Sequence, residues 1–320
     1  MATVGYTLMT EQAGPKDLVQ WAARAENAGF DLLVSSDHYF PWLDEQGHAP
    51  SAWVMLGAAA QATERAELMT YVTCPTMRYH PAVVAQQAAT LALLSDNRFT
   101  LGLGAGENLN EHVIGNGWPD ADRRQEMLTE AINIIRALLD GGYVNFEGAH
   151  FRVDAARIWD LPDRPVPLGV AVSGQQSCEL FAPLADVMIA VEPDGSLGEW
   201  WDAAAGAGRP ARKVGQMPIC RARTGTSASS GRTSSSAGSA AAGRSTRNCP
   251  ARRASPVPPA SSGPRTWPAR YPAAIPWTRW PRRQEPSSRP DLRTSPWSRS
   301  AVPNRSRTGS SRPRRNSSPR

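Results

Sequence analysis

Strand-like and helix-like segments alternate along the first 220 residues, and any fold proposed for the chain has to accommodate that alternation. Short apolar runs with strand character recur between segments with a period of about 3.6 residues. The expected strands are residues 3–9, 31–36, 67–74, 98–103, 166–172 and 187–191, with the start of a seventh at 213–220. The expected helices are residues 17–28, 51–62, 81–94, 121–139, 175–184 and 197–207, with a small hairpin at 142–146 and 150–153.

This repetition predicts a parallel sheet whose strands are joined by helical crossovers. Six to seven strand–helix units fit a (β/α)8 barrel better than a five- or six-stranded doubly wound sheet. A complete barrel of this type needs about 250 residues, and here the pattern stops near residue 220. We therefore expect an α/β fold of the TIM-barrel type that is incomplete.

The last hundred residues have a different composition. Residues 221–320 hold 21 of the 35 basic residues and 2 of the 29 acidic ones, so their net charge is +19 and that of residues 1–220 is −13. Arg, Ser and Pro make up 57 of these hundred residues, whereas Leu, Ile and Val together number four. Because such a segment cannot bury enough apolar surface to offset its ordering entropy, we expect a disordered tail.

Two explanations of the tail compete. A basic, Trp-containing arm could bind nucleic acid or acidic membranes. Alternatively, a GC-rich coding sequence read out of frame would yield mainly Arg, Ser, Pro, Ala and Gly, and the complete absence of Lys fits that bias. We favour the frameshift, so the two expected segments are a partial barrel at 1–220 and a low-complexity tail at 221–320.

The remaining composition points to a cytoplasmic protein. Residues 1–6 enter a strand pattern at once, without the basic region or cleavage site of a secretory signal. No apolar run is long enough to span a membrane. The four cysteines at positions 74, 178, 220 and 249 form no CxxC pair, so we expect neither a disulfide framework nor a metal site.

Polar and titratable side chains follow the expected strands, which is where a barrel places its active site. The pair Asp37–His38 follows the second strand, and a His beside an Asp can carry a proton near neutral pH. The alternative is a helix-capping Asp with an incidental exposed His. Glu107 follows Gly-Ala-Gly after the fourth strand, and a buried carboxyl there would have a raised pKa. The alternative for Glu107 is a surface carboxylate at a helix N-terminus.

Three motifs together resemble the luciferase-like flavin and deazaflavin oxidoreductases, in particular the branch related to coenzyme F420-dependent glucose-6-phosphate dehydrogenase. The motifs are Ser-Ser-Asp-His at 35–38, Thr-Cys-Pro-Thr-Met-Arg-Tyr-His-Pro-Ala at 73–82, and the stretch from Asn97 to Glu111 that contains Gly-Ala-Gly-Glu. The resemblance runs from Val4 to about Cys220 and implies the (β/α)8 fold.

The resemblance also implies roles for particular residues. His38 and Glu107 match the proton-transfer pair, and Trp42 matches an aromatic residue that shapes the substrate pocket. The residues implied to bind coenzyme F420 are Asp37 and Cys74 near its ring, Ala105, Gly106 and Asn110 around its tail, and Ser173, Gly174, Gln176 and Ser177 at its phosphate. The last group makes physical sense because the N–H groups at the start of a helix favour an anion.

The resemblance implies hydride transfer between coenzyme F420 and a small molecule. The family's sugar-phosphate dehydrogenases carry a hydroxyl and a Lys after the sixth strand, where this chain has Val-Glu-Pro-Asp at 191–194. Since acids repel a phosphate, we expect an alcohol, carbonyl or enone substrate and not glucose-6-phosphate. The alternatives are an FMN-dependent luciferase-like monooxygenase, and an inactive truncated barrel with a polyanion-binding tail. We expect no membrane or specific nucleic-acid partner, and a homodimer is left open.

Overall fold

The computed structural model describes residues 3–192, 194–206 and 212–219. The described strands of the main sheet are β1 (Gly5–Leu8), β2 (Leu32–Ser35), β3 (Glu67–Thr70), β4 (Phe99–Leu103), β7 (Leu168–Ala171), β8 (Val187–Ala190) and β9 (Arg212–Gly215). The α-helices are α1 (Pro15–Asn27), α2 (Ala52–Ala62), α3 (Pro81–Leu94), α4 (Asn108–Glu111), α5 (Ala121–Leu139), α6 (Gln175–Phe181) and α7 (Gly195–Ala205). A separate hairpin consists of β5 (Val144–Glu147) and β6 (Arg152–Ala156), and two short 3-10 helices are Asp44–Gln46 and His112–Ile114.

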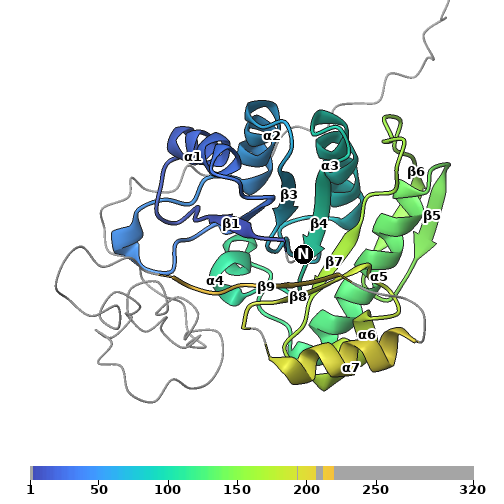
Figure 1. The fold of residues 1–320 in the computed structure, drawn as a ribbon. Coiled ribbons are helices and arrows are strands. Elements are labelled where there is room, and N and C mark those ends of the chain that lie inside the picture. Colours follow the sequence, from blue (N-terminus) through green and yellow to red (C-terminus); the bar gives the residue numbers. More distant parts are fainter. Residues whose placement is uncertain (1–2, 193, 207–211, 220–320) are drawn as a thin grey trace, which may run out of the picture. The chain divides into compact units, whose positions relative to one another are not determined.

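The seven strands form one parallel sheet in the order β1-β2-β3-β4-β7-β8-β9. Each strand lies beside the next one in the chain, apart from the hairpin inserted between β4 and β7 (Figure 1). This is the topology of a β/α barrel, and the predicted α/β fold of six to seven units is confirmed.

Side chains from the two ends of the strand order meet, so the sheet is curled. The Tyr71 hydroxyl, just after β3, donates to the carbonyl of Ala190 on β8 at 2.7 Å. Gln216, just after β9, donates to the Thr7 hydroxyl on β1 at 3.1 Å, and Arg212 on β9 pairs with Glu67 on β3. Among the described residues, β1 and β9 are each paired with one neighbour.

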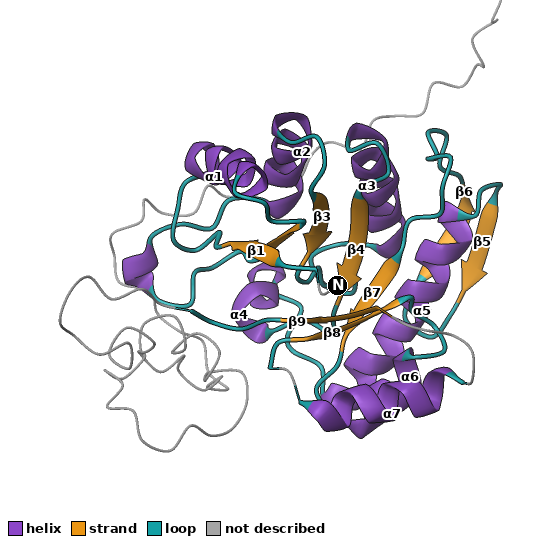
Figure 2. Ribbon diagram, viewed as in Figure 1, coloured by secondary structure: helices purple, strands orange, loops and turns teal. Residues whose placement is uncertain are grey.

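Two separate apolar clusters follow from the curl. The larger one lies between the sheet and the helices on its outer face (Figure 2). The smaller one is made by β2, β3 and β8, which are not all neighbours in the sheet, and therefore lies inside the curl. Its buried members are Leu32, Val34, Met69, Val187 and Ile189.

Helix starts follow local sequence rules. Pro81 occupies the first position of α3, and the Nδ1 atom of His80 accepts the N–H of Ala82 at 3.2 Å as a cap. The carboxyl of Asp120 caps α5 by accepting the N–H of Arg123 at 2.9 Å. Both helices have the bounds expected from the sequence, whereas β3 ends at Thr70 instead of residue 74, and α4 was not predicted.

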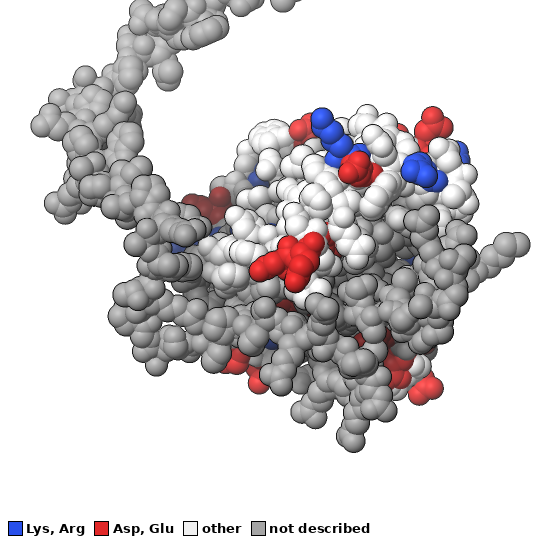
Figure 3. Space-filling view, turned by 90° about the vertical axis from the view of Figure 1, so that its left-hand side faces the viewer, with Lys and Arg blue, Asp and Glu red and all other residues white. Residues whose placement is uncertain are grey.

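The predicted disordered tail at 221–320 lies outside the described residues. Of the cysteines, Cys74 and Cys178 are described and free. None of the described helices combines the length and the apolar character that crossing a membrane requires. On the face shown in Figure 3, acidic and basic side chains are interspersed over uncharged surface, without a continuous basic patch among the residues described.

Candidate active site

Side chains from four consecutive strands gather at the carboxyl ends of β1 to β4. Glu11 follows β1, His38 follows β2, Arg78 lies in the segment after β3, and Glu107 follows β4. The sequence predicts His38 and Glu107 at this edge of the sheet, but it does not predict Glu11. Its only sequence signal is its place directly after the first strand, at the edge where the other candidates lie.

Glu11 and His38 form a close pair. The Oε1 atom of Glu11 lies 2.6 Å from Nδ1 of His38 and also accepts a hydrogen bond from the Ser36 hydroxyl at 2.8 Å. Glu11 is 1% exposed. Burial pushes the pKa of its carboxyl upward, but the contacts with His38 and Ser36 outweigh burial, and the pKa is lowered. An ionised Glu11 therefore stands beside the imidazole, and its buried Oε2 atom has no hydrogen-bond partner among the described residues.

Glu107 belongs to the same cluster. Its Oε2 atom is buried, and no residue in the described ranges forms a hydrogen bond with it. Burial raises the pKa of its carboxyl, the charge of His38 opposes this, and the carboxylates of Glu11 and Glu111 add to it. Glu107 stands at the N-cap of α4, but its side chain makes no capping hydrogen bond. Because Oε2 is buried, Glu107 is not the surface carboxylate at a helix N-terminus that the alternative describes. The structure brings His38 and Glu107 into one electrostatic neighbourhood.

Asp37 points into the protein instead of capping a helix. It is 3% exposed, and its carboxylate accepts the hydroxyls of Thr73 at 2.8 Å and Tyr79 at 3.3 Å. The Oδ1 atom of Asn110 accepts two backbone N–H groups, from Tyr39 at 2.8 Å and Phe40 at 3.2 Å. Asn110 thus holds the loop that carries His38, and its predicted contact with a cofactor tail stays a prediction, as does the ring contact of Asp37.

Cys74, Ala105 and Gly106 meet where the segments after β3 and β4 touch. Gly106 has a φ of +80°, and a Cβ atom there would lie 2.5 Å from the Cys74 sulfur. Ala105 beside it is half-buried. Burial, aided by Glu111, raises the pKa of the Cys74 thiol to about 11. The glycine is therefore required by the neighbouring sulfur, which is a reason the sequence did not indicate.

The predicted phosphate segment surrounds the start of α6, at the carboxyl end of β7. The Ser177 hydroxyl accepts the N–H groups of Ser173 at 3.1 Å and Gly174 at 3.2 Å and donates to the Gly174 carbonyl at 2.8 Å. Gln176 is exposed in the first turn. The anion-binding role of these residues stays a prediction.

Aromatic rings flank the cluster. Trp42 lies edge-on to His38, with ring centroids 5.0 Å apart. Tyr39 is exposed, and Phe40 lies against His112 with centroids 5.2 Å apart. The Trp42 ring is thus in place to border a substrate held at His38.

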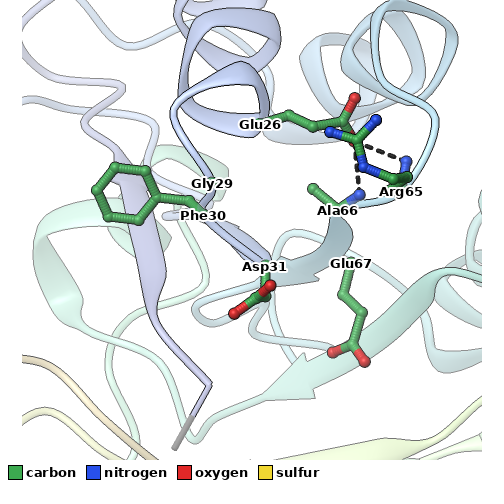
Figure 4. Close-up of a pocket in the computed structure, with 7 residues that line it drawn as sticks. All are labelled: Glu26, Gly29, Phe30, Asp31, Arg65, Ala66 and Glu67. Carbon is green, nitrogen blue, oxygen red and sulfur yellow. Dashed lines mark hydrogen bonds between the residues drawn. The ribbon is translucent and has the colours of Figure 1, made fainter.

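The opposite end of the sheet holds a hollow of a different kind. It lies where β2 and β3 begin, and Figure 4 shows the seven residues that line it: Glu26, Gly29, Phe30, Asp31, Arg65, Ala66 and Glu67. The Glu26 carboxylate accepts the N–H groups of Glu64, Arg65 and Ala66 at 2.6–3.1 Å. Because the carboxylate is saturated by backbone donors, we assign this end a structural role.

The buried carboxyl of Glu107 leads to a stability prediction. A raised pKa means that the native state holds the proton more tightly than the unfolded chain, so the wild type loses stability as the pH rises through that pKa. Glu107→Gln removes the ionisable group. We expect its free energy of unfolding to exceed that of the wild type by about 1 kcal/mol at about pH 8, and the difference to vanish near pH 4. Urea denaturation at both pH values measures this, and an equal difference at both would contradict it.

Comparisons with known proteins agree with this architecture. Residues 1–267 match the model of the family described as luciferase-like monooxygenase, so the match runs further into the C-terminal segment than the motifs do. A relative from Beutenbergia cavernae named F420-dependent glucose-6-phosphate dehydrogenase is 46% identical over 195 residues, 61% of this chain and 58% of the relative. One of the same name from Amycolatopsis mediterranei is 46% identical over 175 residues, 54% of this chain and 53% of the relative.

A solved structure is similar over a larger share of both chains. It is an F420-dependent secondary alcohol dehydrogenase in complex with an F420-acetone adduct, 34% identical, with a TM-score of 0.63 over 67% of this chain and 68% of that one. The chain thus spans a little over half the length of the two curated relatives, and about two thirds of the solved one.

Proposed function

This chain belongs to the luciferase-like monooxygenase family, and we propose that it is an oxidoreductase that uses coenzyme F420 to interconvert a small uncharged alcohol and its carbonyl compound. The observation that carries the proposal is the cluster of Glu11, His38 and Glu107 at the carboxyl ends of the strands. Two of its buried carboxyl oxygens have no partner within the part of the chain that the structure describes. The names of the relatives support the choice of cofactor.

The cluster fits a polar ligand that exchanges protons. Buried polar atoms without partners are costly, and here Oε2 of Glu11 and Oε2 of Glu107 lie in one cluster with His38. When bound, coenzyme F420 accepts or donates a hydride at C5 of its deazaflavin ring. The residues that would hold it are those at the same edge of the sheet: Asp37, Cys74, Ala105, Gly106 and Asn110 at the ring and tail, and Ser173, Gly174, Gln176 and Ser177 at the phosphate.

The environments of His38 and Glu107 suggest opposite proton roles. Oε1 of Glu11 lies 2.6 Å from Nδ1 of His38, which leaves Nε2 as the imidazole nitrogen that takes the proton of a substrate hydroxyl. The raised pKa of Glu107 keeps its carboxyl protonated to higher pH, as a proton donor requires. In the reverse direction the two roles exchange.

The charge at the site supports an uncharged substrate. Glu192 and Asp194, just after β8, are both exposed acids. Arg78, the arginine of the cluster, is hydrogen-bonded to Asp37 and Glu111. The solved relative with 34% identity is named an alcohol dehydrogenase, whereas the curated relatives are named for glucose-6-phosphate. The substrate therefore has to be tested against both.

Titration of the full chain with coenzyme F420 and, separately, with FMN tests the cofactor. We expect saturable quenching of deazaflavin fluorescence and no saturation by FMN. The reverse order of affinity would favour the monooxygenase alternative. Loss of the oxidised deazaflavin absorbance is then followed with isopropanol and with glucose-6-phosphate. Turnover with glucose-6-phosphate alone would overturn the proposed substrate and leave the proposed cofactor standing.

A further inference from the structure

The loops that carry His38 and Glu107 are connected through hydrogen bonds made by side chains of the segment after β3. His38 lies in the loop after β2, and Glu107 lies in the loop after β4. The segment after β3 lies between them in the sheet order. Its residues Thr73 and Tyr79 hold the Asp37 carboxylate, so the middle segment contacts the His38 loop directly.

Arg78 connects all three segments. Its Nη2 atom donates to the backbone carbonyl of Asp37 at 2.6 Å, and its Nε atom donates to Oε1 of Glu111 at 3.0 Å. Its backbone N–H donates to Oε2 of the same Glu111 at 3.0 Å. The side chain of Arg78 is 9% exposed, and that of Glu111 is 1% exposed. These are charge-assisted bonds in a water-poor environment, where such bonds are strongest.

The two partners of the Arg78 side chain are each connected to the proposed proton-transfer pair, one through a peptide bond and the other through a backbone hydrogen bond. The carbonyl of Asp37 belongs to the peptide bond that joins Asp37 to His38. The N–H of Glu111 donates to the carbonyl of Glu107 at 3.1 Å. A planar guanidinium with donors in fixed directions therefore sets the distance between the two backbone segments.

We propose that Arg78 is the positioning residue of this site, whose guanidinium holds the His38 loop and the Glu107 turn at the separation that proton transfer requires. The expected loss of turnover rests on the proposed roles of His38 and Glu107, whereas the expected change in the position of the His38 loop does not. Because a misplacement of about 1 Å can cost on the order of 10²-fold in rate, the loss of this link is expected to be large.

Arg98 provides a matched control at the other end of the sheet. Its guanidinium makes four hydrogen bonds, to the carbonyls of Ala60, Thr63 and Ala66 and to the Thr63 hydroxyl, at 2.7–3.1 Å. Replacing Arg98 by Met removes a comparable set of bonds far from the cluster. The R98M variant therefore shows how a general loss of stability affects the measured signals.

The first experiment uses the imidazole signals of the full chain, which has five histidines. The signals of R78M, R78K and R98M are compared with the wild type by NMR without cofactor, after circular dichroism has established folding. We expect R78M and R78K to displace the His38 signal and leave the His150 signal in place, since a Lys keeps the charge but not the planar fork. R98M should displace neither signal. An unmoved His38 signal in R78M overturns the proposal whether or not the chain uses coenzyme F420.

The second experiment is a double-mutant cycle in turnover. R78M is expected to lower kcat by on the order of 10²-fold and to change KM little, and to have no further effect in an H38A background, because the geometry it maintains no longer matters. Equal losses in both backgrounds would assign Arg78 a merely structural role. Should R78M fail to fold, E111M removes both acceptor oxygens with a side chain of similar length, and a kcat equal to the wild type would overturn the proposal.

Discussion

Replacing His38 by Ala is expected to lower kcat by about 10²- to 10⁴-fold, the usual contribution of a positioned general base. The imidazole carries two ring nitrogens that can accept or donate a proton, and its Nδ1 atom lies 2.6 Å from Oε1 of Glu11. The affinity for the cofactor should change little, because the role proposed for His38 is in proton transfer and not in cofactor binding. Steady-state turnover and cofactor titration of the same preparation measure the two effects separately.

His150 is the control for this substitution. It pairs with Glu126 at 3.2 Å on α5, away from the cluster, so H150A should retain the kcat of the wild type. A loss in H38A no larger than that in H150A would remove His38 from the mechanism, and with it the central residue of the proposed function.

Replacing Gly102 by Ala is expected to unfold the chain or to destabilise it by more than about 4 kcal/mol, which is an exceptional value for one methyl group. A Cβ atom at this position of β4 would lie 2.0 Å from the Thr70 carbonyl oxygen of β3. That oxygen is backbone and cannot move aside without breaking the sheet. The Thr70 side chain also exchanges hydrogen bonds with both the N–H and the carbonyl of Gly102, at 2.9 and 2.8 Å.

Gly57 is the matched control for Gly102. It lies within α2, and nothing stands within 4 Å of where its Cβ would be. G57A should therefore raise the free energy of unfolding by about 0.5–1 kcal/mol, because Ala loses less backbone entropy than Gly in a helix. Urea denaturation of both variants decides the point, and two effects of the same sign would contradict the stated contacts.

The parts of the fold that could be predicted are those with local signals. Residues 81–94 and 121–139 match α3 and α5 because a cap residue and an apolar period fix both helices. The strand expected at 67–74 ends at Thr70, because the ladder with β4 is interrupted there and Thr73 makes only an isolated bridge with Leu103. The short α4 was missed because four residues carry no periodicity.

The site was predicted in part for a similar reason. His38 and Glu107 lie in motifs, and strand-end position alone placed them at one edge. Glu11 stands in Thr-Glu-Gln after the first strand, with no motif around it, and it lies beside His38 because β1 and β2 are paired neighbours in the sheet. Arg78 lies in the motif at 73–82, yet its two partners are 41 and 33 residues away in the chain, which no local pattern reveals.

The two ends of the sheet differ in how fully their charged groups are satisfied. At the amino end, the Glu26 carboxylate accepts three backbone N–H groups, while at the carboxyl end Glu11 and Glu107 each keep a carboxyl oxygen with no partner among the described residues. Among the described residues, buried carboxyl oxygens without a partner thus lie at the edge that carries the candidate site. Exchanging the loops at that edge should therefore alter the range of substrates while leaving the bonds of Glu26 at the opposite edge in place.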